Sequence, residues 1–254
     1  MRRSVATLNQ SFVLRHARLS ELDTVAAFYR EQHSERLPAP STRDLYETLD
    51  NGRFLIVEPL DGGVIAACAA IFDFTSHDCP RYVGELSGTR VTRALGGLGP
   101  MSFQGLLLRA RLAGYVATAS EHPEGRSSSL ITIVKSDNAP SLQNVESAGF
   151  VRLEHRPEWF AYDDLSWHGS IIEDDWQFFL ATEATVQDAL RSLSELGVFR
   201  GQIELSRMNR DSGLTEQFSI RIDLPDIAYA VQDLADIMDG RRHAGLSDLP
   251  DSLV

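Results

Sequence analysis

The sequence predicts an α+β fold in which helices flank a mixed, mostly antiparallel sheet. Short apolar runs rich in β-branched residues alternate with segments whose apolar residues recur at helical spacing. Two of these runs, 54–57 and 64–74, flank the turn Asp61-Gly62-Gly63, and Asp-Gly between apolar runs is a strong hairpin signal. The last third follows the order strand, helix, strand, strand, helix, which indicates an additional small βαββα sandwich.

Length and charge divide the chain into two expected domains. The 254 residues suffice for one large domain or two ordinary ones, and the polar stretch 163–175 suggests a boundary. We therefore expect one domain over residues 1–169 and a second, of unknown role, over residues 170–254. The net charge is -12, and residues 170–254 hold 16 acidic against 7 basic residues. This balance argues against binding to a nucleic acid backbone.

Composition indicates a cytoplasmic protein. No apolar run approaches the roughly 20 residues that span a bilayer, and the N-terminus has no apolar core typical of a secretory signal. Cys68 and Cys79 are isolated, so neither a disulfide framework nor a metal site is expected.

The N-terminal third begins with a strand and two helices. Residues 12–19 read as a strand, and Ser20 is a plausible N-cap for the following helix, with Asp23 three residues on. A second helix is expected from Ser41 to Leu49. Beyond the hairpin, residues 82–91 (YVGELSGTRV) read as a fourth strand.

A glycine-rich segment, Thr92 to Gln104, connects this strand to a helix expected over about 102–119. Glycines let backbone N–H groups close on phosphates at a helix N-terminus, where the helix dipole favours negative charge. The segment is therefore a candidate phosphate-binding loop, and a solvated surface loop is the simpler alternative.

The stretch Ser129 to Leu153 contains a strand, a helix and the start of another strand. Its β-branched first half is typical of a buried strand, and Asn138-Ala139-Pro140-Ser141 opens the helix. Gly149 lies where the helix should stop, because glycine enters the left-handed region at little cost. Phe150 then begins the next strand.

This order of elements, with the Asn138…Gly149-Phe150 pattern, resembles the GNAT superfamily of acyl-CoA-dependent N-acyltransferases over residues ~10–165. The resemblance implies that acetyl-CoA or another acyl-CoA binds in a gap between the strand near residue 130 and its neighbour. It also implies that the backbone at Val91 holds the acyl carbonyl, and that Asn138 contacts the cofactor arm besides capping its helix. The remaining cofactor-binding candidates are the cation and glycines of the loop: Arg93, Gly96, Gly97 and Gly99.

Two positions depart from the family pattern. With Gly97 and Gly99 as the loop glycines, Ala94 stands where the family has Arg or Gln; starting at Arg93 instead puts Leu98 in the final position. Val145 stands where the family often has a Tyr that serves as general acid.

The expected reaction is acyl transfer to a small-molecule amine, which requires a base to deprotonate the amine. In the family this base is often a carboxylate on the fourth strand, and Glu85 fits that position; an ordinary strand charge is the alternative. Two other functions stay open: a non-catalytic module that binds a ligand or partner, and an acyltransferase whose donor is carrier-bound or tRNA-bound. The second domain would bind substrate, cover the acceptor site or form a homodimer interface.

Overall fold

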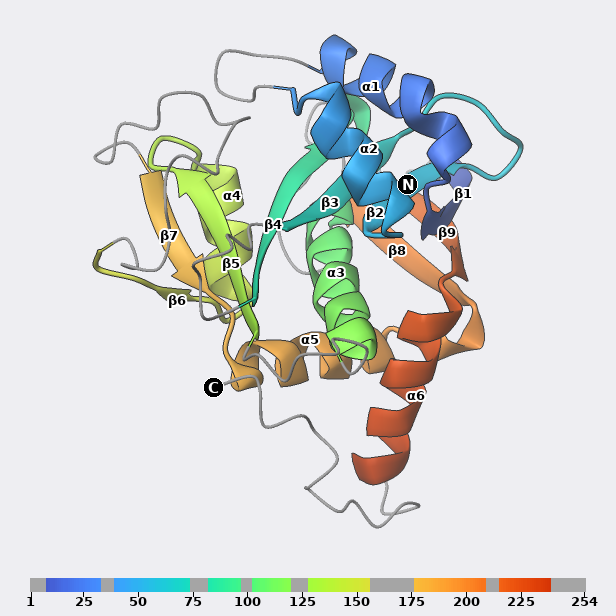
Figure 1. The fold of residues 1–254 in the computed structure, drawn as a ribbon. Helices are drawn as coiled ribbons and strands as arrows, with labels where there is room; N and C mark the ends of the chain where they lie inside the picture. The colour runs from blue at the N-terminus through green and yellow to red at the C-terminus, as the bar shows by residue number, and fades with distance from the viewer. Residues whose placement is uncertain are drawn as a thin grey trace, which may run out of the picture.

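The computed structural model describes residues 8–32, 39–73, 82–96, 102–119, 128–155, 176–208 and 215–238. These residues form one nine-stranded sheet in the order β6-β7-β5-β4-β3-β2-β1-β9-β8, with helices on both faces (Figure 1). The strands are β1 (Leu8–His16), β2 (Phe54–Pro59), β3 (Ala67–Asp73), β4 (Tyr82–Val91), β5 (Ser128–Lys135), β6 (Val151–Arg152), β7 (Trp176–Leu180), β8 (Gln202–Met208) and β9 (Thr215–Asp223). The α-helices are α1 (Leu22–Glu31), α2 (Thr42–Asp50), α3 (Phe103–Ala119), α4 (Ala139–Ser147), α5 (Glu183–Glu195) and α6 (Pro225–Met238).

The sheet is mixed and mostly antiparallel, as predicted. Parallel pairing occurs between β4 and β5 and between β1 and β9, and the remaining neighbours pair in antiparallel orientation. The α+β class and the mixed sheet are thereby confirmed. No described helix is long and apolar enough to cross a membrane.

The last third contributes to this sheet, so the expectation of a separate sandwich is not met within the described residues. Its elements occur in the predicted order, but β7 pairs between β5 and β6, and β9 pairs with β1. The alternation along β9 explains the second pairing, because Phe218, Ile220 and Ile222 are buried in the same core as Phe12 and Leu14 of β1. The boundary expected near residue 169 lies outside the described residues.

The end of the predicted acyltransferase sheet also differs from expectation. The sequence predicts a strand that begins at Phe150, but β6 spans only Val151–Arg152, and residues 156–162 lie outside the described part. The long neighbour of β5 is instead β7, which comes later in the chain. A two-residue strand at the sheet edge leaves β7 to pair with β5 directly.

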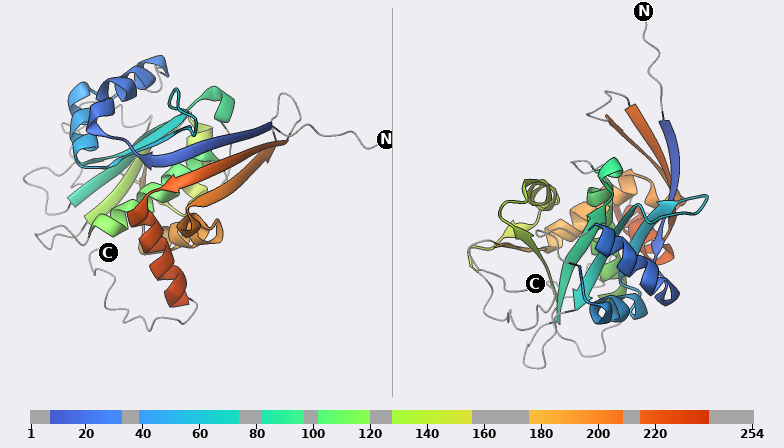
Figure 2. Two further views of the ribbon diagram at one scale, coloured as in Figure 1. Left: turned by 90° about the vertical axis from the view of Figure 1, so that its right-hand side faces the viewer. Right: turned by 90° about the horizontal axis from the view of Figure 1, so that it is seen from above.

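Two helical layers enclose the sheet (Figure 2). The helices α3 to α6 cover one face over the largest core, whereas α1 and α2 cover the other face over a second core. A third, small cluster of Val83, Ile131, Ile133 and Phe178 lies on strands β4, β5 and β7. The central helix α3 packs against β3, β4, α5 and α6, so it lies over the middle of the sheet.

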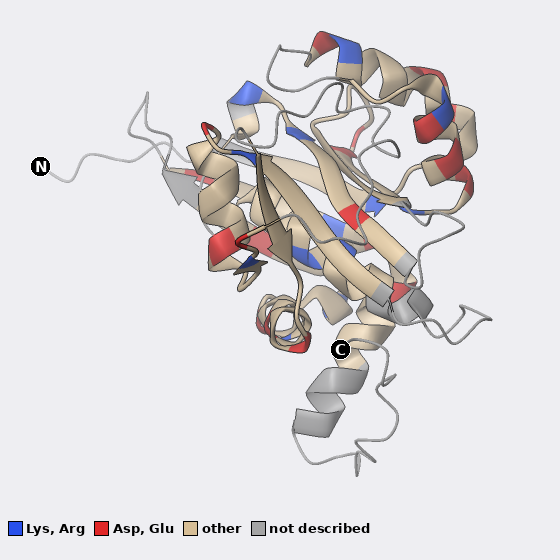
Figure 3. Ribbon diagram, turned by 60° about the vertical axis from the view of Figure 1, so that its left-hand side comes forward, with Lys and Arg blue, Asp and Glu red and all other residues tan. Residues whose placement is uncertain are grey.

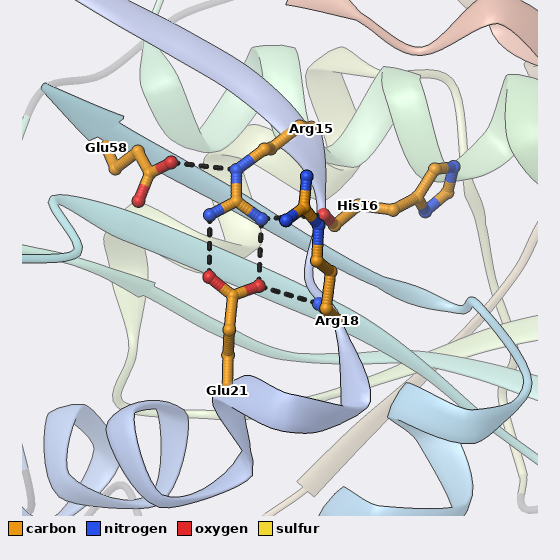
Figure 4. Close-up of polar contacts among 5 residues, drawn as sticks. All are labelled: Arg15, His16, Arg18, Glu21 and Glu58. Carbon is orange, nitrogen blue, oxygen red and sulfur yellow. Dashed lines mark hydrogen bonds and ion pairs between the residues drawn. The ribbon is translucent and has the colours of Figure 1, made fainter. Parts of the chain in front are cut away.

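The first two helices begin in different ways. Ser41, which was expected to begin the second helix, caps α2: its hydroxyl accepts from Asp44 N–H at 3.1 Å, and the Asp44 carboxylate accepts from Ser41 N–H at 3.2 Å. Ser20, in contrast, lies inside a 3₁₀ turn, Leu19–Glu21, that precedes α1. There the Glu21 carboxylate accepts from Arg18 N–H at 2.7 Å (Figure 4). Glu21, and not Ser20, occupies the N-cap position of α1, but its side chain makes no cap bond to that helix.

Candidate functional site

The candidate site begins where the parallel strands β4 and β5 stop pairing. Their ladder covers four residue pairs, from Tyr82 with Ser128 to Glu85 with Ile131, although β4 continues to Val91 and β5 to Lys135. At the end of the ladder, the Thr132 hydroxyl donates to the Leu86 carbonyl at 2.9 Å and takes the place of a backbone bond. Beyond this point the carboxyl halves of the two strands are separate.

A β-bulge in the second half of β4 shapes one wall of this gap. The register with β3 shifts between Cys68 and Ala70, opposite Gly88, and Gly88 has a φ of 63°. The buried hydroxyl of Tyr29 donates to the Gly88 carbonyl. A Cβ atom at Gly88 would lie 2.5 Å from the Tyr29 hydroxyl oxygen, so only glycine fits here.

Arg111 of α3 holds the bulge from the other side. Its guanidinium donates to the Ala70 and Ser87 carbonyls, each at 2.8 Å, and to the Thr89 hydroxyl at 2.8 Å. Burial lowers the pKa of Arg111 to about 10, while the charges of Tyr29 and Glu85 act in the opposite direction. The arginine therefore ties β3 to β4 next to the bulge, through one carbonyl group of each strand.

The gap contains a cavity of about 90 Å³, bounded by β4, β5, β7, α3 and α4. Three cationic residues line it, and no carboxylate lines it among the described residues. This is notable in a chain of net charge -12, whose acidic positions are spread over outer elements such as α1 and α2 (Figure 3). The lining residues are Leu86, Ser87, Gly88, Thr89, Arg90, Gln104, Leu108, Arg111, Thr132, Ile133, Val134, Lys135, Asn138, Ser141, Asn144, Val145 and Trp176. A cavity whose charged residues, among those described, are all cations favours an anionic ligand.

Polar side chains join α3 to α4 along one wall of the cavity. Gln104 donates to the Ser141 hydroxyl at 3.2 Å and accepts from the Asn144 amide at 2.9 Å. Asn144 also donates to the Pro140 carbonyl at 3.0 Å, and Asn138 accepts from Ser141 N–H at 3.3 Å as the cap of α4. These bonds fix the first turn of each helix relative to the other.

A cation and an aromatic ring lie together where β5 ends. The Lys135 ammonium is 6.0 Å from the centre of the Trp176 ring, and the two residues are cross-strand neighbours on β5 and β7. Lys135 is the single lysine of the sequence.

Glu85 lies next to the cavity but does not line it. It is 0% exposed, and its neighbours across the sheet are Phe72 on β3 and Ile131 on β5. Both neighbours are buried with the apolar clusters on the face that α1 and α2 cover. Glu85 therefore belongs to the strand that the resemblance implies, on the opposite face of the sheet from α3 and α4.

The cofactor-binding candidates fall into three groups. Asn138 lines the cavity, as its predicted role requires. Val91, Arg93 and Gly96 are described but are not among the lining residues; Arg93 begins a 3₁₀ turn and Gly96 is exposed. Gly97 and Gly99 lie outside the described residues.

Several lining residues were not predicted from the sequence. Val145 lines the cavity at the position where the family often has a Tyr, and Gln104 is the last residue of the predicted glycine-rich segment. Asn144 and Arg111, in contrast, were not predicted. Arg111 could have been identified from the sequence, because a charged residue within an apolar helix requires a buried partner. Lys135 could also have been identified, because it is the single lysine of the sequence.

Comparisons with known proteins give matches of fold only. No family model and no curated protein matches this chain. Solved structures of GNAT acetyltransferases match about two thirds of it. A GNAT-family acetyltransferase from Bacillus cereus ATCC 10987 matches 67% of this chain and 96% of its own, with 16% identity and a TM-score of 0.40. A ribosomal-protein-alanine N-acetyltransferase from Brucella melitensis matches 66% of this chain and 98% of its own, with 20% identity and a TM-score of 0.43.

A third match was solved with its ligands. It is the diaminobutyrate acetyltransferase from Paenibacillus lautus, in complex with L-2,4-diaminobutyric acid and coenzyme A. It matches 68% of this chain and 95% of its own, with 15% identity and a TM-score of 0.42.

Proposed function

We propose that the protein transfers an acyl group from an acyl-CoA to a small-molecule amine. The observation that carries this proposal is the gap between β4 and β5, which opens after four ladder pairs and contains the cavity. The family resemblance implies an acyl thioester in such a gap. Asn138 at the cavity also occupies the position that the resemblance implies for contact with the cofactor arm.

The lining residues fit a phosphorylated donor. Arg90, Arg111 and Lys135 make the cavity positive, and an acyl-CoA carries several negative charges. On the side of β4 that faces β5, the backbone beyond Glu85 has no ladder partner. Its N–H groups are therefore available to stabilise the oxyanion that forms when an amine attacks the thioester carbonyl.

Proton transfer is assigned to Glu85. We place it as the base that takes the proton of the amine through a water molecule, because its buried carboxylate does not line the cavity. The leaving thiolate needs no acid at Val145, since a thiol with a pKa near 8.5 departs readily as the anion. The proposed roles thus need neither a tyrosine nor a metal.

Calorimetry with acetyl-CoA and longer acyl-CoAs tests donor binding, and an amine panel tests turnover. We expect Glu85→Gln to bind the donor normally and to lose about 100-fold or more in kcat. The matched control is Glu204→Gln on the edge strand β8, which should leave both quantities unchanged. Unchanged turnover in Glu85→Gln would remove this residue from the role of base, and absence of donor binding would overturn the function.

A non-catalytic binding module is the second candidate. It is favoured by the absence of a carboxylate among the described lining residues and by Val145 in place of Tyr. This alternative predicts acyl-CoA binding without turnover of any amine. The same two measurements therefore separate the two functions.

A further inference from the structure

Asn144 is a buried polar residue with an unused acceptor at the cavity. Its side chain lies on α4 and is 2% exposed, and the residue lines the cavity. The Oδ1 atom is buried and has no hydrogen-bond partner. Buried acceptors are nearly always paired in folded proteins, so an unpaired one beside a cavity points to a partner that the cavity receives.

The orientation of the amide follows from its neighbours. Nδ2 donates to the Pro140 carbonyl at 3.0 Å, and a carbonyl oxygen only accepts, so the nitrogen must face Pro140. The second N–H of Nδ2 donates to Gln104 Oε1 at 2.9 Å. Because Nδ2 of Asn144 can only donate, the oxygen of Gln104 must face it, and the nitrogen of Gln104 then donates to the Ser141 hydroxyl at 3.2 Å. Both donors of Asn144 are thus used within the protein, and exchange of its nitrogen and oxygen would break two bonds.

We infer that Asn144 Oδ1 accepts a hydrogen bond from an amide N–H in the arm of the acyl donor, and so selects donors that carry a pantetheine arm. The inference rests on the proposed function and deepens it. The arm contains two secondary amides, and each presents one N–H donor. Free acyl-CoA and a carrier-bound acyl-pantetheine share this arm, so either source satisfies Asn144.

Two synthetic analogues of acetyl-CoA test the contact directly. In each analogue one amide of the arm is replaced by an ester, which removes a single N–H donor and keeps the length of the arm. We expect wild-type protein to bind one analogue about 10-fold more weakly than acetyl-CoA in calorimetry, and the other nearly as tightly. Equal affinity for acetyl-CoA and both analogues would overturn the inference and leave the proposed function intact.

Two variants identify the acceptor. Asn144→Leu keeps the size of the side chain and removes Oδ1, and it should bind acetyl-CoA and the sensitive analogue equally. Gln104→Leu is the matched control, because it removes the two hydrogen bonds that Gln104 makes in the same wall and keeps Oδ1 of Asn144; discrimination should persist. Persistent discrimination in Asn144→Leu would contradict the inference. Because the readout is a ratio of affinities within each variant, a general loosening of the wall does not imitate the effect.

A simpler donor tests whether the partner of Oδ1 lies in the arm or in the nucleotide. Acetyl-pantetheine should show the same dependence on Asn144, because it retains both amides and lacks only the nucleotide. If only acetyl-CoA depended on Asn144, the partner of Oδ1 would lie in the nucleotide and the inference would be wrong. If no donor bound at all, the proposed function itself would fail.

Discussion

Gly88 shows how one backbone position determines the shape of the cleft. Its left-handed conformation places the bulge in β4, and the bulge turns the Ser87 and Gly88 carbonyls toward Arg111 and Tyr29. No other residue type reproduces this geometry without moving the Tyr29 ring. The cleft therefore depends on a residue that contributes no side chain to it.

We expect Gly88→Ala to destabilise the protein by about 2–4 kcal/mol, through left-handed strain and overpacking against Tyr29. Gly52 supplies the control, because its φ is 66° and a Cβ atom there would meet nothing within 4 Å. Gly52→Ala should cost only the conformational strain, about 1 kcal/mol. Urea unfolding measures both. Equal losses in the two variants would show that the bulge tolerates a methyl group.

At the scale of single residues, the sequence allows only part of the site to be predicted. Asn138 could be predicted as the cap of α4 from its place before Pro140, and it also lines the cavity; its contact with a cofactor stays a prediction. Asn144 could not be found in this way, since its importance depends on Pro140 and on Gln104, which comes from another helix. Glu85 was placed on the correct strand, but its burial follows from neighbours on β3 and β5 that local patterns do not identify.

At the scale of elements, Arg15 connects the end of β1 to the start of α1. Its guanidinium donates to both oxygens of Glu21, at 2.7 and 2.8 Å, and its Nε donates to Glu58 of β2 at 2.7 Å (Figure 4). A fork that binds one carboxylate with two bonds restricts orientation as well as distance. The position of the α1 layer over the sheet therefore depends on this ion-pair cluster.

We expect Arg15→Gln to lower the free energy of unfolding by about 1–2 kcal/mol, since the three side chains are only 15–27% exposed. Arg43→Gln is the control, because the Arg43–Glu47 pair is 85% and 55% exposed, and solvent screening should leave it almost no contribution to stability. A loss no larger than that of the control would show that the cluster is dispensable.

The ion pair between Arg15 and Glu21 also makes the stability of the protein depend on pH. Arg15 lowers the pKa of Glu21 below 4.5, so the folded state binds this proton less readily than the unfolded state. The resulting stability is fully present above pH 4.5 and is lost as pH falls through the lowered pKa. In unfolding titrations at a series of pH values, the Arg15→Gln variant should therefore lose less stability than the wild type as the pH falls below 4.5.

Element boundaries were largely predictable, whereas strand partners were not. Residues 82–91 form β4 as predicted, because β-propensity and alternation are local properties. Pairing of β9 with β1 joins segments from opposite ends of the chain, and no local pattern records it. The expected separate sandwich was wrong in the described part for this reason: its strands have the predicted pattern but pair elsewhere.

At the scale of the whole molecule, the last third completes the core over α3. Ile227 of α6 is 1% exposed and packs next to Gly114 of α3, where an added Cβ atom would lie 3.4 Å from its side chain. The described residues thus share one continuous core on this face. Two-state unfolding of the entire chain is the expected consequence.

We expect Ile227→Ala to shift a single unfolding transition and to cost about 2–4 kcal/mol. Its neighbour Tyr229 is 68% exposed, so Tyr229→Ala should change stability by no more than about 0.5 kcal/mol. Calorimetric scanning with near-UV circular dichroism follows the transition. Two transitions, of which only one responds to Ile227→Ala, would contradict this expectation and indicate that the C-terminal part unfolds as an independent domain.

Pairing of β1 with β9 also has a consequence for synthesis of the chain. Leu8 pairs with Glu216 and Arg15 with Asp223, so the first strand finds this partner only after almost all of the chain has left the ribosome. Until then one long side of β1 is an open edge that other chains can extend. The distance in sequence between these strands also implies slow formation of this part of the sheet. The nascent chain is therefore exposed to aggregation along β1 until β9 has been synthesised.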